Sequence, residues 1–268
     1  MSNPIDLKDV TFLIPIRLDG IQRIENLLMV IEHLSFHFHT NISVLEADGY
    51  NNLLLAQLLP KYVQISFVED YDPVFHRTHY INRMVEQCTT PLVAVWDADV
   101  IVPAQQIEES VRWLRKGEAD FVRPYADKFL DTSEIIRELY FRTRDIRSLQ
   151  NHHGKMKHLY VPFPVGGGFF AQLKKYRESG LENEKFYGWG IEDGERVNRW
   201  MILGYNYKNT AGVMYHLSHP RGKNSQFHHP QQLEIKNGAL FQIASMSKSE
   251  LKEEIGGWNS SQKRCDQG

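Results

Sequence analysis

Apolar runs alternate with amphipathic segments along the first part of the chain. Val10 to Ile16 is an apolar run that predicts a buried strand. Apolar residues at helical spacing follow at Ile21, Ile24, Leu27, Leu28, Ile31 and Leu34. Two more strands are predicted at Ile42 to Asp48 and Val63 to Asp70, with a helix at Thr78 to Cys88. This alternation predicts an α/β fold with a central, mostly parallel sheet flanked by helices.

The stretch from Pro91 to Val100 is apolar until it reaches Asp97 and Asp99. A central parallel strand ends in this way where it meets the ligand crevice at the carboxyl edge of a sheet. Because one residue separates the two acids, an extended backbone points both to the same face, where they could share one divalent cation. Carboxylate oxygens suit magnesium or manganese, which could also bind a diphosphate. The alternative is a turn with two solvated aspartates.

A second pair of acids stands at a predicted helix start, in the sequence FYGWGIEDGERV from Phe186 to Val197. Asp193 would stay ionised there, because unpaired backbone N–H groups and the helix dipole favour an anion. That suits a general base or a group that binds hydroxyls, although ordinary helix capping explains the same acids without a function. Trp189 lies between two glycines, and a flat aromatic ring beside carboxylates is typical of a carbohydrate site.

Histidines gather later in the chain, where Ala211 to Pro230 is predicted to form a short strand and a polar loop. His216 is a candidate metal ligand, since imidazole beside carboxylate favours manganese over magnesium. A single histidine in a strand also has a purely structural explanation. His219, His228 and His229 are predicted to be loop residues, because their spacing fits no firm ligand pattern.

The remaining segments complete one domain. A helix is predicted to begin at Pro103, and the basic stretch from Arg142 to His158 is expected to be a helix end and a mobile loop. One or two helices follow near the C-terminus, one with a capping box from Ser247 to Glu250. We expect a donor-binding half at about 8–125, an acceptor and catalytic half at about 126–230, C-terminal helices at 231–258 and a polar tail at 259–268.

Composition narrows the class of protein. Hydrophobic residues make up 42% of the chain, charged residues 24%, and the formal net charge is -2, as in ordinary globular proteins, so no nucleic-acid partner is expected. The N-terminus lacks the pattern of a signal peptide, and no apolar run approaches the roughly 18 residues of a membrane span. We therefore expect a cytoplasmic protein. Cys88 and Cys265 lack metal-site spacing and are expected to be reduced.

Four motifs follow one another in a characteristic order: WDAD (Trp96 to Asp99), VGGGFFA (Val165 to Ala171), GLENEKFYGWGIEDGERVNR (Gly180 to Arg199) and MYH (Met214 to His216). Together with FLIPIRLD (Phe12 to Asp19), they resemble the GT-A glycosyltransferases of the β-1,4-galactosyltransferase type. Related bacterial capsule and chondroitin-type polymerising enzymes share the pattern. The resemblance covers most of the chain and implies a GT-A fold, which is Rossmann-like.

The resemblance implies an inverting transferase that moves galactose or an N-acetylhexosamine from a UDP-sugar to a glycan or a lipid-linked oligosaccharide. It implies manganese, with magnesium as an alternative, bound by Asp99 and His216, and a base at Asp193. The pathway implied is polysaccharide or lipopolysaccharide synthesis in a bacterium, at the inner face of the membrane and with at most peripheral association. Glu192 and Trp189 would bind the sugars.

Further roles are carried over position by position. Pro15, Arg17, Phe75, Arg77 and Asp97 are expected in the donor nucleotide pocket, with Asp48 facing the uracil or ribose. Tyr187, Gly167 and Gly168 are expected at the sugars. The chain has Tyr187 and Ile191 where the family often has tryptophan and glycine, and Met214 stands two residues before His216, so it is not expected to bind metal.

Two other classes of protein share parts of this pattern. A nucleotide-sugar or glycan binding protein without turnover would use every motif except the base. A nucleotidyltransferase would need a glycine-rich basic loop after its first strand, and IPIRLDGIQR matches that poorly. The presence of both Glu192 and Asp193 favours an enzyme.

Overall fold

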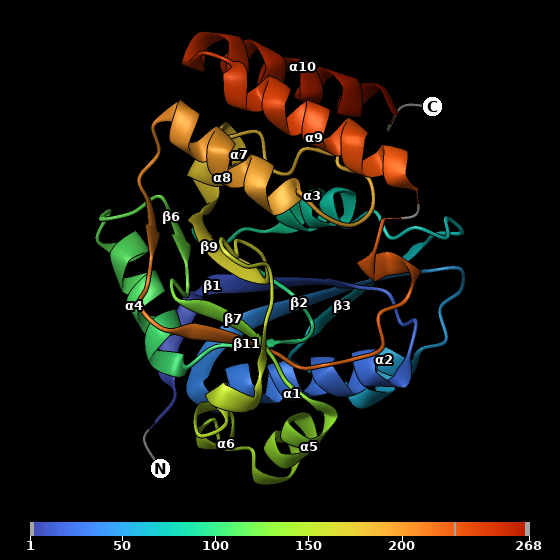
Figure 1. Ribbon diagram of the computed structural model, residues 1–268, viewed down its shortest axis with the longest axis vertical. Coiled ribbons are helices and arrows are strands. Elements are labelled where there is room, and N and C mark those ends of the chain that lie inside the picture. The colour runs from blue at the N-terminus through green and yellow to red at the C-terminus, as the bar shows by residue number, and fades with distance from the viewer. Residues whose placement is uncertain (1–2, 228, 266–268) are drawn as a thin grey trace.

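The computed structural model describes residues 3–227 and 229–265 (Figure 1). The central sheet contains β1 (Ile5–Ile16), β2 (Phe38–Asp48), β3 (Gln64–Glu69), β4 (Leu92–Trp96), β6 (Phe121–Arg123), β9 (Gly168–Gln172) and β10 (Tyr207–Asn209). Their order in the sheet is β10, β6, β9, β4, β1, β2, β3. β9 runs antiparallel to its neighbours β4 and β6, and the other pairs are parallel. The predicted α/β fold with a mostly parallel sheet is confirmed.

A second, smaller sheet begins shortly after β4. It contains β5 (Val100–Ile101), β7 (Lys128–Asp131), β8 (Lys157–His158) and β11 (Val213–His216), in the order β5, β11, β7, β8. His216 pairs with Val100, and the N–H of Leu217 donates to the carbonyl of Asp99 at 2.7 Å. This pairing brings the histidine strand beside the aspartates that follow β4, although more than a hundred residues separate them in sequence.

Helices cover both faces of the central sheet (Figure 1). They are α1 (Ile21–His37), α2 (Leu54–Leu58), α3 (Arg77–Gln87), α4 (Ala104–Arg115), α5 (Glu134–Thr143), α6 (Arg147–Gln150), α7 (Leu173–Glu178), α8 (Glu192–Leu203), α9 (Pro230–Ser245) and α10 (Lys248–Cys265), with short 3-10 turns η1 (His153–Lys155) and η2 (Lys223–Ser225). Side chains of β1 alternate between faces, so Phe12 packs in the cluster with α1 and α4, and Leu13 in the cluster with α3 and α8. α9 and α10 form an outer layer over α8 (Figure 1).

Several local predictions can be compared with the structure. The capping box is confirmed: the N–H of Glu250 donates to Ser247 Oγ, and the N–H of Ser247 to the Glu250 carboxylate. The mobile loop expected at Arg142 to His158 is wrong, because α6, η1 and β8 lie there and bury Leu149 and Met156. α10 continues to Cys265, into the expected polar tail.

The two remaining expectations concern the cysteine thiols and membrane-spanning helices. Cys88 is a free, buried thiol. Within residues 3–227 and 229–265, no helix is both long and apolar enough to cross a bilayer.

Candidate functional site

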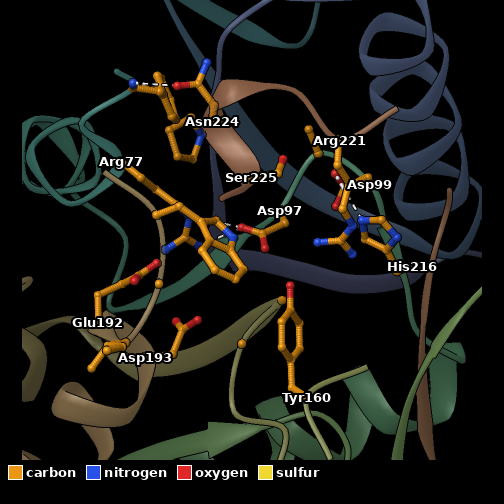
Figure 2. Close-up of a pocket in the computed structure, with 18 of the residues that line it drawn as sticks. Arg77, Asp97, Asp99, Tyr160, Glu192, Asp193, His216, Arg221, Asn224 and Ser225 are labelled. Atoms are coloured by element: carbon orange, nitrogen blue, oxygen red, sulfur yellow. Dashed lines mark hydrogen bonds and ion pairs between the residues drawn. The ribbon is translucent and has the colours of Figure 1, made fainter. Parts of the chain in front are cut away.

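A cavity of about 580 Å³ opens at the carboxyl ends of β1 and β4. This volume is in the range of small-molecule sites. Eleven residues expected from the sequence line it: Pro15, Arg17, Phe75, Arg77, Asp97, Asp99, Gly167, Trp189, Glu192, Asp193 and His216. Figure 2 shows Asp97 near the centre, with Glu192 and Asp193 on one side and Asp99 and His216 on the other. Segments far apart in the sequence therefore meet at one edge of the sheet.

Three expected residues do not belong to the cavity wall. Asp48 accepts a hydrogen bond from the N–H of Gly49 at 2.7 Å, and Tyr187 donates to Asp72 at 2.6 Å. Gly168 lies in β9 against Trp96, where a Cβ would stand 2.8 Å from Trp96 Cε3. This close packing against Trp96 accounts for a glycine at position 168, and contact with a substrate is not needed to explain it.

Asp99, His216 and His219 form a cluster whose possible ligand atoms all lie within 4.8 Å of one another. The Nε2 atoms of His219 and His216 lie 3.1 and 3.6 Å from Asp99 Oδ2. All three side chains are at least nine-tenths buried. His219 was predicted to be a loop residue that fits no firm ligand pattern. It does lie in the loop after β11, but its ring is close to the aspartate.

The other ring nitrogen of each histidine is held in place. His216 Nδ1 lies 2.7 Å from Asp131 Oδ1, and His219 Nδ1 lies 2.9 Å from the carbonyl of Pro220. An acceptor at Nδ1 holds a proton on that nitrogen, so a neutral ring would leave the lone pair of Nε2 for a cation beside Asp99. One carboxylate and two oriented imidazoles are a donor set that fits a divalent transition metal, with manganese among them.

Positive groups surround Asp99. Arg23 of α1 donates to Asp99 Oδ2 at 3.1 Å. Burial acts to raise the pKa of Asp99, but the charge of His216, hydrogen bonds from both histidines and the charge of Arg23 together lower it well below its usual range. Burial likewise acts to lower the pKa of His216, yet the carboxylates of Asp99 and Asp131 raise it to about 9.

Asp97 has a different partner. Arg77, at the start of α3, donates twice to Asp97 Oδ1, at 2.6 and 3.1 Å. Burial raises the pKa of Asp97, and the charges of Asp99 and Asp193 add to this effect while Arg77 opposes it. Arg77 Nη1 is buried without a hydrogen-bond partner among the described residues. A buried donor of this kind usually has an explanation, and the Arg77 side chain lines the cavity.

Glu192 and Asp193 stand at the first turn of α8, as predicted. The turn before them is unusual: Gly190 and Ile191 both have left-handed backbone angles, with φ of 93° and 76°. Such a φ is rare for a β-branched residue and costs about 1–2 kcal/mol, and strain of this kind is concentrated at functional sites. It bends the chain so that both acids line the cavity.

The two acids differ in ionisation. Burial and the charge of Asp193 raise the pKa of Glu192 to about 7. Burial acts on Asp193 in the same direction, but the charges of Arg196 and Arg77 and a hydrogen bond from Arg196 lower its pKa below the ordinary value. Glu192 Oε2 is buried with no hydrogen-bond partner in the described part of the chain. One acid is thus held ionised, and the other has an unused oxygen.

Asp193 is fixed from two sides. Arg196, itself buried and paired with Glu182 at 2.7 Å, donates to Asp193 Oδ1. On the other side, Asp193 Oδ2 lies against Gly166, so close that a Cβ built on Gly166 would stand 2.6 Å away. The hydroxyl of Tyr125 donates to the Gly166 carbonyl at 2.8 Å and anchors that backbone.

Aromatic rings form the end of the cavity that faces α9. Trp189 meets Phe227 edge to face at a centroid distance of 5.2 Å, and Tyr160 at 6.4 Å. Lys236 of α9 donates to the carbonyl of Trp189 at 2.7 Å and holds the loop. Leu233, Asn237 and Leu240 of the same helix complete this wall.

Sequence reasoning missed Arg23, Asp131, Gly166, His219 and the wall supplied by α9. The spacing H-x-x-H of His216 and His219 was a signal that could have suggested the second histidine. His228 lies outside the described residues, and His229 caps α9 by accepting from the N–H of Gln231 at 3.3 Å.

Solved structures share this architecture. The catalytic domain of Drosophila β1,4-galactosyltransferase 7, in complex with xylobiose, aligns with a TM-score of 0.55 and 16% identity over 87% of this chain and 79% of that one. The chain has a GT-A fold. A mutant of the same Drosophila enzyme, with manganese, UDP-Gal and xylobiose, aligns with a TM-score of 0.54 and 15% identity over 86% and 79%.

The structure of another nucleotide-sugar enzyme gives a similar match. A mannosyltransferase from Pyrobaculum calidifontis, with GDP-Man and Mn²⁺, aligns with a TM-score of 0.53 and 14% identity over 94% of this chain and 74% of that one. No protein-family model matches the chain, and no curated protein matches its sequence. At these identities the likeness establishes the GT-A fold, and the activity has to be argued from the cavity.

Proposed function

We propose that this protein is an inverting, metal-dependent glycosyltransferase that moves galactose or an N-acetylhexosamine from a UDP-sugar to a hydroxyl of a glycan. The observation that carries the proposal is the pairing, in one cavity of a GT-A fold, of the Asp99, His216 and His219 cluster with the fixed carboxylate of Asp193. A cluster for a cation and a separate carboxylate are the two parts that metal-assisted sugar transfer requires.

Asp99, His216 and His219 would hold manganese or magnesium, and the two imidazoles favour manganese over magnesium. A bound divalent cation supplies Lewis-acid stabilisation of the diphosphate leaving group. Asp131 orients the imidazole of His216 through Nδ1. Asp97 is kept next to Asp99 by Arg77 and supports the donor.

Arg17 places the nucleotide end of the donor. Its Nε donates to the carbonyl of Ala47 at 2.9 Å, and its guanidinium pairs with Asp70 at the end of β3. Phe75 packs 5.6 Å from the same guanidinium. A third contact, from Nη1 to the carbonyl of Asp72 at 2.6 Å, completes its restraint. An arginine held in this way next to an aromatic ring provides a rigid platform for a base and ribose, and Pro15 at the end of β1 lines the same cavity.

Asp193 is the proposed base. Its lowered pKa keeps it ionised across the neutral range, which also makes it a weak base, so the proton moves late in the reaction. As the acceptor oxygen bonds to the anomeric carbon, the bond from that carbon to the diphosphate oxygen breaks, and the hydroxyl becomes acidic enough to give its proton to Asp193. Attack opposite the leaving group inverts the anomeric centre.

Glu192 and the aromatic wall bind the sugars. The unpartnered Oε2 of Glu192 is suited to a sugar hydroxyl, because a buried oxygen without a partner costs roughly 1–3 kcal/mol until one is supplied. Trp189 presents its ring to the C–H face of a sugar. The acceptor proposed is a glycan or a lipid-linked oligosaccharide in bacterial polysaccharide or lipopolysaccharide synthesis, used by a cytoplasmic enzyme with at most peripheral membrane contact.

The test is UDP release from a panel of UDP-sugars, with and without Mn²⁺ and simple sugar acceptors. Metal-dependent release from one donor supports the proposal and names the sugar. Asp193→Asn should abolish release and keep UDP–Mn²⁺ affinity, whereas Asp99→Ala should abolish that affinity. Asp145→Asn, which makes the same change outside the cavity, is the matched control. UDP binding without release from any donor would instead indicate a nucleotide-sugar binding protein.

A further inference from the structure

Arg23 donates a hydrogen bond to the Asp99 oxygen that faces both histidines of the candidate metal site. Its Nη1 lies 3.1 Å from Asp99 Oδ2, the same oxygen that faces His219 Nε2 at 3.1 Å and His216 Nε2 at 3.6 Å. The Arg23 side chain is one-fifth exposed and lines the cavity. Three positive or proton-donating groups thus converge on one carboxylate oxygen.

A divalent cation and this guanidinium compete for the negative charge of the same carboxylate. A cation among Asp99 and the two histidines would place two positive charges within a few ångströms of Arg23, in a buried site where repulsion is poorly screened. Binding of the cation therefore favours displacement of Arg23, and the free energy of the Arg23–Asp99 ion pair lowers the metal affinity.

The released guanidinium has an anion to bind. A nucleoside diphosphate that ligates the cation lies beside Asp99 by necessity, and the planar fork of arginine matches phosphate oxygens. Arg23 stays near that place because its other contacts are local. Nε lies 3.3 Å from Asp19 Oδ1, and Nη2 lies 3.4 Å from Ser225 Oγ.

We infer that Arg23 is a counter-ion switch: it neutralises Asp99 when the site is empty, and it binds the diphosphate of the donor once a cation has taken Asp99. The inference rests on the proposed function and adds a residue and an order of events to it. Metal alone binds weakly because it must expel Arg23, and metal with nucleotide binds well because Arg23 gains a new partner. Such coupling is typically about 5- to 150-fold.

The experiment measures two affinities for Arg23→Gln, which keeps the length of the side chain and removes its charge. Mn²⁺ alone is titrated by electron paramagnetic resonance, and UDP is titrated by calorimetry at saturating Mn²⁺. We expect Mn²⁺ alone to bind about tenfold tighter than to the wild-type protein, and UDP to bind about tenfold weaker. Arg23→Lys, which keeps the charge, should restore most of the UDP affinity.

Arg221→Gln is the matched control. It removes an equal charge from the same cavity, but Arg221 makes no hydrogen bond to Asp99 in the described structure, whereas Arg23 does. Equal Mn²⁺ affinity of the wild type and Arg23→Gln, or the same gain in Arg221→Gln, would overturn the switch and leave the proposed function standing. Weaker Mn²⁺ binding by Arg23→Gln would show a structural role and also overturn it. If neither Mn²⁺ nor UDP binds to the wild-type protein, both proposals fail.

Discussion

The position of Asp193 can be tested without changing Asp193 itself. Gly166→Ala would add a methyl group 2.6 Å from Asp193 Oδ2, where ordinary contacts are 3.4 Å or more. The carboxylate would have to retreat by about 0.8 Å, since the Gly166 backbone is anchored through its carbonyl by Tyr125. Arg196 holds the other oxygen, so the retreat also disturbs that ion pair.

A displacement of this size is large for a general base. A misplacement of about 1 Å can cost roughly 100-fold in rate, which corresponds to about 2.7 kcal/mol of transition-state stabilisation. We therefore expect kcat of Gly166→Ala to fall by about 100-fold. The affinity for UDP and Mn²⁺ should stay unchanged, because Asp99 and its histidines do not touch Gly166.

The assay is UDP release at saturating donor and acceptor, with calorimetry for UDP–Mn²⁺ affinity and thermal unfolding as a check on the fold. Gly154→Ala is the control, because a Cβ there meets nothing within 4 Å. A wild-type kcat in Gly166→Ala, while Asp193→Asn is inactive, would refute the claim that the exact place of the carboxylate matters. A fall in the unfolding temperature that accounts for the lost activity would refute it as well.

Three further predictions follow from the same contacts. Asp131→Ala should weaken Mn²⁺ binding about 10- to 100-fold, because the imidazole it orients loses its acceptor; unchanged affinity in a calorimetric titration would contradict this. Glu192 has a folded-state pKa of about 7, above its ordinary 4.5, so the folded state binds more protons in that window and the wild type loses stability as pH rises through it. The unfolding temperature of Glu192→Gln should therefore exceed that of the wild type by more at pH 8 than at pH 5, and a constant difference would be evidence against the shift. Gly167→Ala should lower the free energy of unfolding by about 2–3 kcal/mol, because φ is +89° and the new Cβ would press on Met214 Sδ and stand 3.0 Å from Phe129 Cζ; a denaturant titration that shows no loss would disprove the close packing.

Local patterns predicted the strands and helices that position the site. Apolar runs that end in acids became β2, β3 and β4, and the acids of Asp97 and Asp99 lie where a parallel sheet presents its carboxyl edge. The start of α8 at Glu192 was equally local, because the glycines just before it and the acids of its first turn are visible in the sequence. These features depend on a few neighbouring residues, so the sequence contains them.

Contacts across the fold were out of reach. His219 joins Asp99 only because β11 pairs with β5, and Arg23 reaches the same oxygen from α1. Arg23 carries no local signal, and the H-x-x-H spacing was the one hint of His219. The segment from Arg142 to His158 was mistaken for a loop because its helices are too short to show a period. Its burial depends on Ile146, Leu149 and Met156, which pack against the main hydrophobic core.

α9 supplies one wall of the cavity while the carboxyl edge of the sheet supplies the other, and the two are joined through Lys236 and the loop at Trp189. Leu233, Asn237 and Leu240 can therefore be exchanged without altering Asp99 or its histidines. On the proposed function, this wall of the sugar-binding cavity can therefore vary while the cation cluster stays the same. On the same proposal, substitutions confined to this face of α9 would change which sugars the cavity binds and leave the cation cluster intact.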